Sequence, residues 1–478
     1  MDRPAPRRPR TPCGESIRRL DGWAGQTALV HVVIVGGGEV GWYLAERLRA
    51  ESHDVVLVEM DDRIARAISE SLDVQVVVGN ACHPSVLVEA GVERASLLAG
   101  VTQSDEVNLI TSLLGKQFGV ERTVVRIQTD ELYGDDGRRL LAAVGADVVM
   151  DPDFDTAKEI LELVHLSGAD EVYPMVEGQL VVLGATIRPG AAVAGQALRN
   201  VGASLSSERD FLFGAVTRRG ETVIPHGDEV LEVGDHVRVL TTRSARRSTL
   251  QLLGAAKQQA RRMMMLGGGA VGSRVAREMT AEGVEVVLVE RDVEIAERLA
   301  AEMPHARILH GDVTDIDLLR EASIATMDVV VATTGEDTAN VLACAFAAAE
   351  GPAFTVAVIH RLALLPLVGQ FGIGATLSPR TASANAVLRE LRGRMGSVTT
   401  FLESDVEANE LEVLAGSRAD GTRISEMGVP LRVLLGAVVR RDGAVEIAGG
   451  ATRLDAGDRV VVFSRAADLQ RAQRLFHP

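Results

Sequence analysis

The sequence is poor in several residue types, and each shortage narrows the possible functions. Aromatic residues make up 3% of the 478 residues, so Val, Leu, Ile and Ala must build the cores. Basic residues are outnumbered by acidic ones, giving a formal net charge of -16. A sequence-independent nucleic-acid binder needs surplus Lys and Arg to neutralise phosphates. We therefore expect no nucleic-acid partner.

Cysteines and long apolar runs are also scarce. Cys13, Cys82 and Cys344 have neither metal-ligand spacing nor an even count for disulfides, which fits a reducing cytosol. No stretch approaches the roughly 20 apolar residues that span a bilayer, so we expect no direct membrane insertion. Residues 1–27 are rich in Pro and Arg and precede an apolar run that leads into a glycine motif. We predict a disordered basic tail there and no signal peptide.

A glycine motif occurs twice, each time after an apolar run. It reads Gly36-Gly37-Gly38-Glu39-Val40-Gly41 in the first copy and Gly267-Gly268-Gly269-Ala270-Val271-Gly272 in the second. A further apolar run ends in Glu59 or Glu290, 23 residues beyond the first glycine of each motif. A strand, a glycine turn, a helix and an acid-tipped strand predict a nucleotide-binding βαβ unit. For the second copy, glycines kept only for packing are the alternative.

The duplication extends along the whole chain and predicts the fold class. Alternating strands and helices predict an α/β protein with two tandem doubly wound parallel sheets, Rossmann-like, each followed by a small α+β or β-rich module. The expected segments are a tail at 1–27, sheet domains at 28–150 and 260–378, linking helices at 151–169 and 379–399, and β-rich modules at 170–250 and 400–478.

Each linking helix has an apolar stripe at i, i+3, i+4 and i+7, which requires a packing partner. Two interpretations stay open: the helix packs on its own sheet domain, or it crosses to another domain or a second copy. The stripes are Ala157, Ile160, Leu161 and Val164 in one copy and Ala384, Val387, Leu388 and Leu391 in the other.

The acids and the loops that follow the strands are candidate ligand contacts. Glu59 and Glu290 would accept hydrogen bonds from ribose hydroxyls and would repel a 2'-phosphate, which favours NAD(H), ATP or ADP over NADP. Arg291 weakens that exclusion in the second half. Thr102 and Gln103 follow the fourth strand, at the edge where open α/β sheets bind ligands, and Thr334 corresponds to this loop.

Arg126 is the most informative charge in the first half. It lies in the apolar strand Thr123 to Ile127, where a cation is costly to bury without an anion. The alternatives are an edge position or an ion pair with a nearby acid. Its counterpart by count is Val358, so the two sites should differ chemically, although His360 and Arg361 lie close enough in sequence to substitute.

We find no set of catalytic residues or metal ligands in the sequence. A nicotinamide dehydrogenase needs an acid or base against the reacting carbon, and the first β-rich segment offers only His226 and His236. We interpret both as surface or core residues, and we expect neither catalytic residues nor a metal.

These units resemble the RCK (regulator of potassium conductance) domains and TrkA-C modules of the regulatory subunits of Trk potassium uptake systems, the TrkA family. The resemblance covers residues 28–478 and rests on the glycine motifs, the loops Ser104–Asn108 and Gly335–Asn340, the Pro-led helices and the repeated Gly-Ala-Val-x-Arg-Arg and Gly-Asp sequences. It implies a homo-oligomeric ring, dimeric or tetrameric. The ring would be cytoplasmic, peripherally associated with the inner face of the plasma membrane, and would regulate a potassium-translocating integral membrane protein.

The resemblance also implies which residues bind NAD(H), or ATP and ADP. Carried over by position, the first site is Gly36, Gly37, Gly38, Glu39, Val40, Glu59, Thr102, Gln103 and Arg126. The second site is Gly267, Gly268, Gly269, Ala270, Val271, Glu290 and Thr334. Two other functions stay open: an NAD-dependent oxidoreductase, and a nucleotide-sensing regulator of a different channel or exporter.

Overall fold

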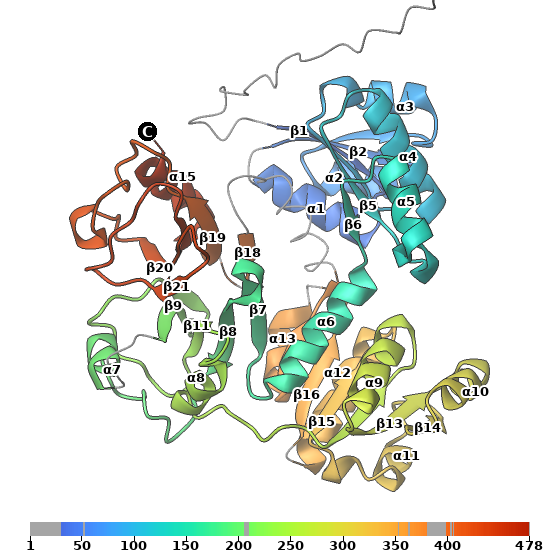
Figure 1. Cartoon of the computed structure of the whole chain (residues 1–478). Coiled ribbons are helices and arrows are strands. Elements are labelled where there is room, and N and C mark those ends of the chain that lie inside the picture. Colours follow the sequence, from blue (N-terminus) through green and yellow to red (C-terminus); the bar gives the residue numbers. More distant parts are fainter. Residues whose placement is uncertain are drawn as a thin grey trace, which may run out of the picture.

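The computed structural model describes residues 30–50, 53–204, 210–351, 353–361, 364–379, 398–401, 404 and 406–477. The predicted tail and residues 380–397 of the predicted second linking helix lie outside these residues, and residues 398 and 399 of that segment belong to a strand. Figure 1 shows two α/β domains joined by a long helix and, beside them, two β-rich modules.

The first sheet domain is a six-stranded parallel sheet in the order β3-β2-β1-β4-β5-β6. The central strands β1, β2, β4 and β5 are short, mostly apolar runs that are largely buried. Helix α1 covers one face of the sheet with an apolar stripe formed by Val40, Leu44 and Leu48. The elements are β1 (His31–Val35), α1 (Glu39–Ala50), β2 (Asp54–Glu59), α2 (Asp62–Ser71), β3 (Gln75–Val78), α3 (Pro84–Glu89), η1 (Val92–Arg94), β4 (Leu97–Gly100), α4 (Asp105–Gln117), β5 (Arg122–Arg126), η2 (Asp130–Tyr133), α5 (Asp135–Ala143) and β6 (Val148–Met150).

The second sheet domain repeats this topology in the order β14-β13-β12-β15-β16-β17. Both sheets reverse their strand order at the first strand, so the predicted doubly wound fold is confirmed. The elements are β12 (Arg262–Leu266), α9 (Ala270–Ala281), β13 (Glu285–Glu290), α10 (Val293–Glu302), β14 (Arg307–His310), α11 (Ile316–Glu321), η4 (Ile324–Thr326), β15 (Val329–Ala332), α12 (Asp337–Glu350), β16 (Phe354–Val358), α13 (Leu365–Val368), η6 (Gly369–Phe371) and β17 (Ala375–Leu377).

Helix α6 (Pro152–His165) leaves the first sheet domain and packs on the second. Asp151 caps it by accepting hydrogen bonds from the N–H groups of Asp153 and Phe154. The stripe residues Ala157, Ile160 and Val164 are at most 1% exposed and share one apolar cluster with residues of β12 and α9. The interpretation that this helix packs on its own sheet domain is therefore wrong, because the other half of the chain covers its apolar face.

The two β-rich modules are five-stranded antiparallel sheets in the orders β10-β9-β11-β8-β7 and β18-β19-β22-β20-β21. The first contains β7 (Glu171–Met175), η3 (Val176–Gly178), β8 (Leu180–Thr186), α7 (Leu198–Ser204), β9 (Phe211–Arg218), β10 (Glu221–Val223), β11 (His236–Thr242) and α8 (Arg246–Leu252). The second contains β18 (Val398–Thr400), β19 (Val406–Glu412), η8 (Ile424–Glu426), β20 (Val433–Val439), β21 (Val445–Ile447), β22 (Arg459–Arg465) and α15 (Ala466–Phe476).

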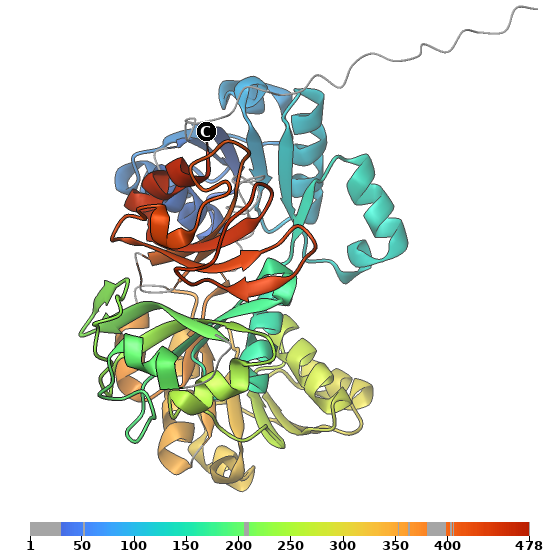
Figure 2. The same ribbon diagram turned by 60° about the vertical axis from the view of Figure 1, so that its left-hand side comes forward.

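The two modules pack against each other, an arrangement shown in Figure 2 that the sequence did not indicate. Phe463 is fully buried between them and stacks on Phe401, with ring centroids 6.3 Å apart. A Cβ atom at Gly214 would lie 2.3 Å from the Phe463 ring, and one at Gly436 would lie 2.8 Å from Leu240. The two glycines therefore allow the sheets to approach closely.

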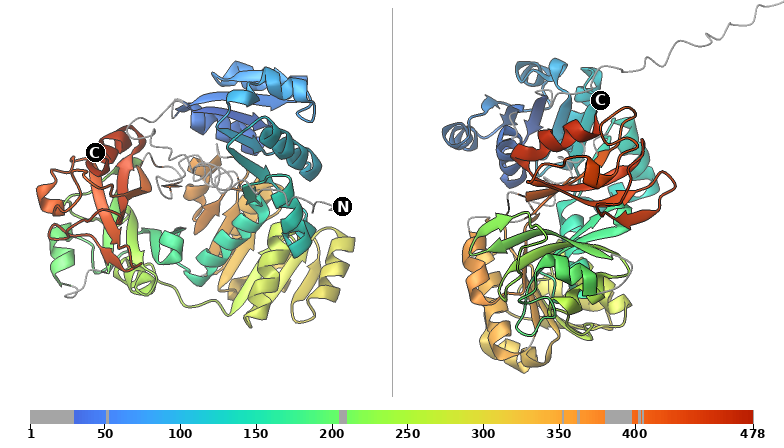
Figure 3. Two further views of the ribbon diagram at one scale, coloured as in Figure 1. Left: turned by 45° about the horizontal axis from the view of Figure 1, so that its top comes forward. Right: turned by 90° about the vertical axis from the view of Figure 1, so that its left-hand side faces the viewer.

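The second module also contacts the first sheet domain (Figure 3). Arg47 of α1 donates from Nη2 to Glu407 Oε1 of β19 over 3.0 Å, and the Glu407 side chain is 3% exposed. This ion pair joins α1, the helix after the first glycine motif, to the C-terminal β module.

The repeated Gly-Ala-Val-x-Arg-Arg and Gly-Asp sequences form an ion pair in each module. Arg218 donates from Nε and Nη2 to Asp235, both over 2.7 Å, and Arg440 donates from Nη1 to Asp458 over 2.7 Å. Burial opposes ionisation of Asp235, but the hydrogen bonds from Arg218 hold the pKa of that carboxyl below its ordinary value. This part of the duplicated sequence serves the fold of the modules.

Arg218→Ala is expected to lower the free energy of unfolding by about 2–3 kcal/mol at neutral pH, because Asp235 would remain buried without its counter-charge. A carboxyl whose pKa is depressed by folding stabilises the protein above its unfolded pKa of about 4 and loses that contribution as the pH falls through the folded pKa. Urea unfolding of wild type and variant should therefore differ less at about pH 3.5 than at about pH 7. Arg440→Ala is the matched change in the second module. If the free energies of unfolding of wild type and Arg218→Ala differ equally at both pH values, this account is contradicted.

Candidate nucleotide sites

The glycine loops have the backbone geometry that only glycine adopts readily. Gly36 has φ +106° and Gly267 has φ +104°. A Cβ atom at Gly41 would lie 1.8 Å from the Gly36 carbonyl oxygen, and one at Gly272 would lie 2.0 Å from that of Gly267. The first and last glycines of each motif are thus required by the tight turn and by the approach of the helix to it.

The outer part of each loop is open. Gly38 and Gly269 are exposed, and a Cβ atom at either would meet nothing within 4 Å. The 12-residue helices α1 and α9 begin directly after them. A helix start has N–H groups without intrahelical partners and a partial positive charge, which favour an anion such as a phosphate.

Each acid at the end of the second strand supports the glycine loop next to it. Glu59 Oε2 accepts from the N–H of Gly37 over 2.6 Å, and Glu290 Oε2 accepts from Gly268 over 2.6 Å. The other oxygen of each carboxylate accepts from the N–H two residues later, over 2.8 Å. Carboxylate oxygens can accept more than one hydrogen bond, so capacity for ribose hydroxyls is left.

Thr102 and Thr334 contact the first glycine of their motifs. Atoms of Thr102 lie 3.0–3.1 Å from the position of a Cβ at Gly36, and atoms of Thr334 lie 3.1–3.2 Å from that at Gly267. Gln103 is exposed beside this contact. Val40 is 7% exposed and packs in the core, so only its backbone is available to a ligand. Arg291 pairs on the surface with Glu336 over 3.3 Å.

Arg126 ends β5, which lies between β4 and β6, so the edge interpretation is wrong. The side chain is half-buried, and its Nε has no hydrogen-bond partner among the described residues. Burial lowers the pKa of the guanidinium, and the acids Asp153, Asp105, Asp151 and Glu39 oppose this shift. The cation lies beyond β4, on the side of β1 away from Glu59.

Val358 takes the place of Arg126 in the second half. The Asn108 amide donates to the Arg126 carbonyl and the Asn340 amide donates to the Val358 carbonyl, both over 2.9 Å. His360 and Arg361 do not restore the charge at this position, since both contact Asp337 through their N–H groups and side chains. They correspond to Gln128 and Thr129, whose N–H groups contact Asp105.

Two residues absent from the predicted sites, Asn108 and Asn340, hold the candidate contacts in place. Their signal in the sequence was an Asn six positions after Thr in both copies. Three acids around Arg126, namely Asp105, Asp151 and Asp153, were also missed, because they come from α4 and the start of α6, whereas Glu39 of α1 belongs to the predicted first site.

His226 and His236 lie in the first β module, away from the glycine loops, and Cys344 is buried. His226 is exposed, and His236 contacts Asp170 over 2.7 Å in the first β module. Burial raises the pKa of Cys344 to about 12. The described part of the chain contains no group of three or more His, Cys, Asp or Glu able to hold a metal ion. Nor is any helix in it long and apolar enough to cross a membrane.

Comparison with known proteins matches all four structural units. Residues 32–152 and 263–379 match the TrkA-N domain family, and residues 182–254 and 410–477 match the TrkA-C domain family. Over 96% of this chain, the fold is similar to the crystal structure of the GsuK RCK domain, with a TM-score of 0.60 over 98% of that chain. It is also similar to the GsuK channel bound to NAD, with a TM-score of 0.60 over 81% of that chain. Identity to both is 18%, so this likeness concerns the fold alone.

Relatives of higher identity extend over nearly the whole chain. The Trk system potassium uptake protein TrkA homolog of Archaeoglobus fulgidus is 31% identical over 94% of this chain and 100% of its own length. The Trk system potassium uptake protein TrkA of Azorhizobium caulinodans is 30% identical over 93% of this chain and 98% of its own length. Because such relatives match all four units in the same order, the chain belongs to the TrkA family of Trk system potassium uptake proteins.

Proposed function

We propose that this chain is the nucleotide-responsive regulatory subunit of a Trk-type potassium uptake system. NAD(H), ATP or ADP binds the sheet domains and acts as a signal that controls a separate potassium-translocating membrane protein. The observation that carries this proposal is the repeated site: in both halves an open glycine loop at a helix start is supported by an acid on the neighbouring strand. The names of the relatives supply the transport system.

The first site would hold the nucleotide across three strands. Its phosphates would lie over Gly36–Val40 at the start of α1, where N–H groups and the helix dipole favour anions. Glu59 would accept from the adenosine ribose on the β2 side. Thr102, Gln103 and Arg126 lie on the β4 and β5 side, where they would meet the part of the ligand beyond the first two phosphates.

The second site would bind through Gly267–Val271, Glu290 and Thr334. It has Val358 where the first site has Arg126, so it lacks a cation for a distal anionic group. We therefore expect the two sites to differ in affinity for the same nucleotide.

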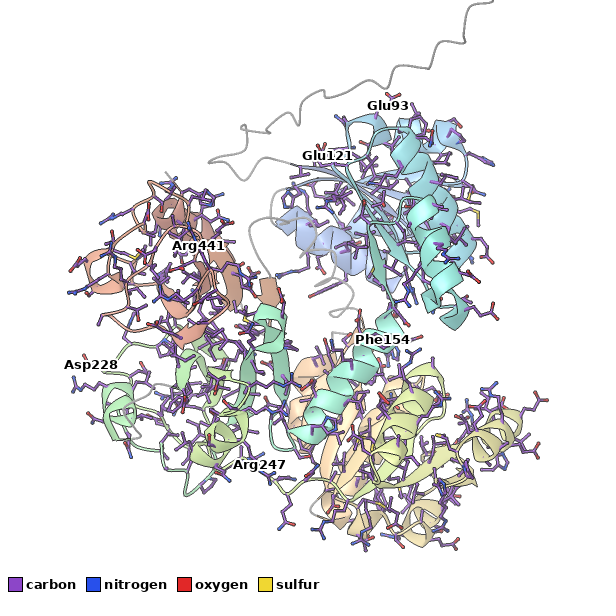
Figure 4. The ribbon with its side chains drawn as sticks, viewed as in Figure 1. Glu93, Glu121, Phe154, Asp228, Arg247 and Arg441 are labelled. Carbon is purple, nitrogen blue, oxygen red and sulfur yellow. The ribbon has the colours of Figure 1, made fainter. Side chains whose placement is uncertain are left out.

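Contacts between the halves give nucleotide binding a route to the rest of the molecule. Asp151 follows β6 at the start of α6 and lies 3.9 Å from Arg274 Nη2 on α9, the helix that begins at the second glycine loop. The Arg274 guanidinium also lies over the ring of Phe154, 5.1 Å from its centroid, at the domain junction seen in Figure 4. A nucleotide that prefers one arrangement of the two domains would shift the population toward it.

Family membership also indicates the assembly and the location in which the protein would act. The family membership supports a cytoplasmic homo-oligomeric ring, dimeric or tetrameric, held at the inner face of the plasma membrane by its potassium-translocating partner. The relatives are named as uptake proteins, which supports a ligand that is a signal and not a reactant.

Isothermal titration of the purified chain with NADH, NAD, ATP and ADP tests the proposal. We expect saturable heat with at least one of these ligands and two sites of unequal affinity. Absence of heat with all four ligands would remove the basis of the proposal, and steady turnover of NADH with a carbonyl substrate would favour an oxidoreductase instead.

A further inference from the structure

One buried amide in each sheet domain joins the two loops that carry candidate nucleotide contacts. Asn108 of α4 is 0% exposed. Its Oδ1 accepts from the N–H of Thr102 over 2.9 Å and from Thr102 Oγ1 over 2.8 Å. Its Nδ2 donates to the carbonyl of Thr102 over 3.0 Å and to that of Arg126 over 2.9 Å. The amide therefore uses its two donors and both acceptor positions of its oxygen.

The chemistry of the four partners requires an amide. The Thr102 N–H can only donate and the two carbonyl oxygens can only accept, so the network fixes which end of the side chain carries the nitrogen. A carboxylate of the same shape would place negative charge against both carbonyl oxygens. An apolar side chain would leave buried N–H and C=O groups without partners.

The second sheet domain contains the same network. Asn340 of α12 is also 0% exposed. Its Oδ1 accepts from the N–H of Thr334 over 3.0 Å and from Thr334 Oγ1 over 2.6 Å. Its Nδ2 donates to the carbonyls of Thr334 and Val358, both over 2.9 Å. The network does not depend on which side chain ends β5 or β16, because it contacts only the backbone carbonyl of Arg126 or Val358.

The network extends to the glycine loop through Thr102. Atoms of Thr102 lie within 3.1 Å of the position that a Cβ at Gly36 would take. A shift of the loop that carries Thr102 would therefore move that loop into the glycine loop or away from it. One side chain therefore fixes the relative positions of the strand ends of β1, β4 and β5. Contacts held in advance lower the cost of ordering when a ligand binds.

We propose that Asn108 and Asn340 are positioning residues for nucleotide binding, each holding the loop after the fourth strand of its domain against the glycine loop. The proposal rests on the proposed function, since it assumes that nucleotides occupy these loops. Beyond that function, the proposal identifies the residue in each site that sets nucleotide affinity without contacting the ligand.

The test is Asn108→Asp in the full chain, titrated calorimetrically with NADH and with ATP between about pH 5.5 and about pH 8.5. A Gly269→Asp background removes the second site, so that one site is measured. We expect at least about tenfold weaker binding at high pH, where the carboxylate has no donor. We expect partial recovery at low pH, because a buried carboxyl titrates above its ordinary range and, once protonated, can donate one hydrogen bond.

Matched variants separate positioning from simple loss of stability. Asn340→Asp in a Gly38→Asp background should show the same pH-dependent weakening at the second site. Asn200→Asp, an exposed change of the same kind on α7, should leave binding unchanged. If Asn108→Asp does not fold, Asn108→Ser replaces it, and lowered affinity in the folded variant is expected.

The outcomes distinguish the inference from the proposed function. If the wild-type chain binds no nucleotide, the proposed function fails first. If the wild type binds and the Asn108 variant binds equally well at every pH, the inference is wrong. The inference is also wrong if affinity falls equally at every pH and in proportion to a lowered melting temperature, because loss of a purely structural residue would have that effect.

Discussion

Gly38→Asp is expected to abolish nucleotide binding at the first site and to leave the fold intact. The position has room, since a Cβ there meets nothing within 4 Å, so the unliganded chain should keep its melting temperature. The new carboxylate would stand at the start of α1, where the phosphates are expected, and like charges held close together repel each other. Titration calorimetry should show a loss of affinity of about 100-fold or more, about 2.7 kcal/mol.

Two matched variants make this result interpretable. Gly38→Ala adds a methyl group in open space without charge and should weaken binding far less. Gly269→Asp makes the same change in the second loop, where a Cβ also meets nothing within 4 Å, and should remove the second site alone. Unchanged titration of Gly38→Asp would mean that the first glycine loop does not hold the phosphates.

Phe463→Ala is expected to have the largest effect on stability. The ring is fully buried, stacks on Phe401 and fills the space above Gly214 in the opposite module. Removing a buried aromatic ring typically costs about 3–5 kcal/mol, because the lost burial is joined by a cavity that closes only in part. Urea unfolding followed by circular dichroism measures the loss, and a shift below about 1 kcal/mol would contradict the packing described above.

Phe476→Ala is the control for the position of the cavity. Phe476 is also fully buried, but it packs within the second module. We expect both variants to destabilise that module, whereas only Phe463→Ala should loosen its contact with the first. Limited proteolysis should then cut between the modules sooner in Phe463→Ala than in Phe476→Ala.

The parallel sheets could be predicted because their signals are local. The strands are short apolar runs, and the stripe Val40, Leu44 and Leu48 follows the period of a helix. The glycine motif carries its own geometry, since the turn at Gly36 and the close contact at Gly41 each require a residue without a side chain. For these elements, a window of a few residues contains the physical cause.

The rest depended on contacts between distant residues. The stripe of α6 required a partner but did not identify it, because helix periodicity is the same whichever surface covers it. Gly214 and Gly436 looked like ordinary strand residues, and only the packed modules explain why a side chain cannot stand there.

Polar positions in the sites were hidden for a related reason. Asn108 lies on a helix, where an amide usually faces water, and its burial follows from carbonyl groups that other strands supply. The acids near Arg126 likewise come from three separate elements, so no local pattern brings them together.

The contact between the β-rich modules has a consequence for how the two halves could diverge. When two identical chains associate about a two-fold axis, any residue that favours the contact is present on both sides and must be compatible with itself. Here Leu240 of β11 faces Gly436, and its counterpart Phe463 of β22 faces Gly214, so the two halves keep the same glycine but differ in the side chain that packs on it. Covalent linkage keeps the halves together at any protein concentration and removes the demand for self-complementarity. Each half is then free to change alone, as Arg126 and Val358 illustrate.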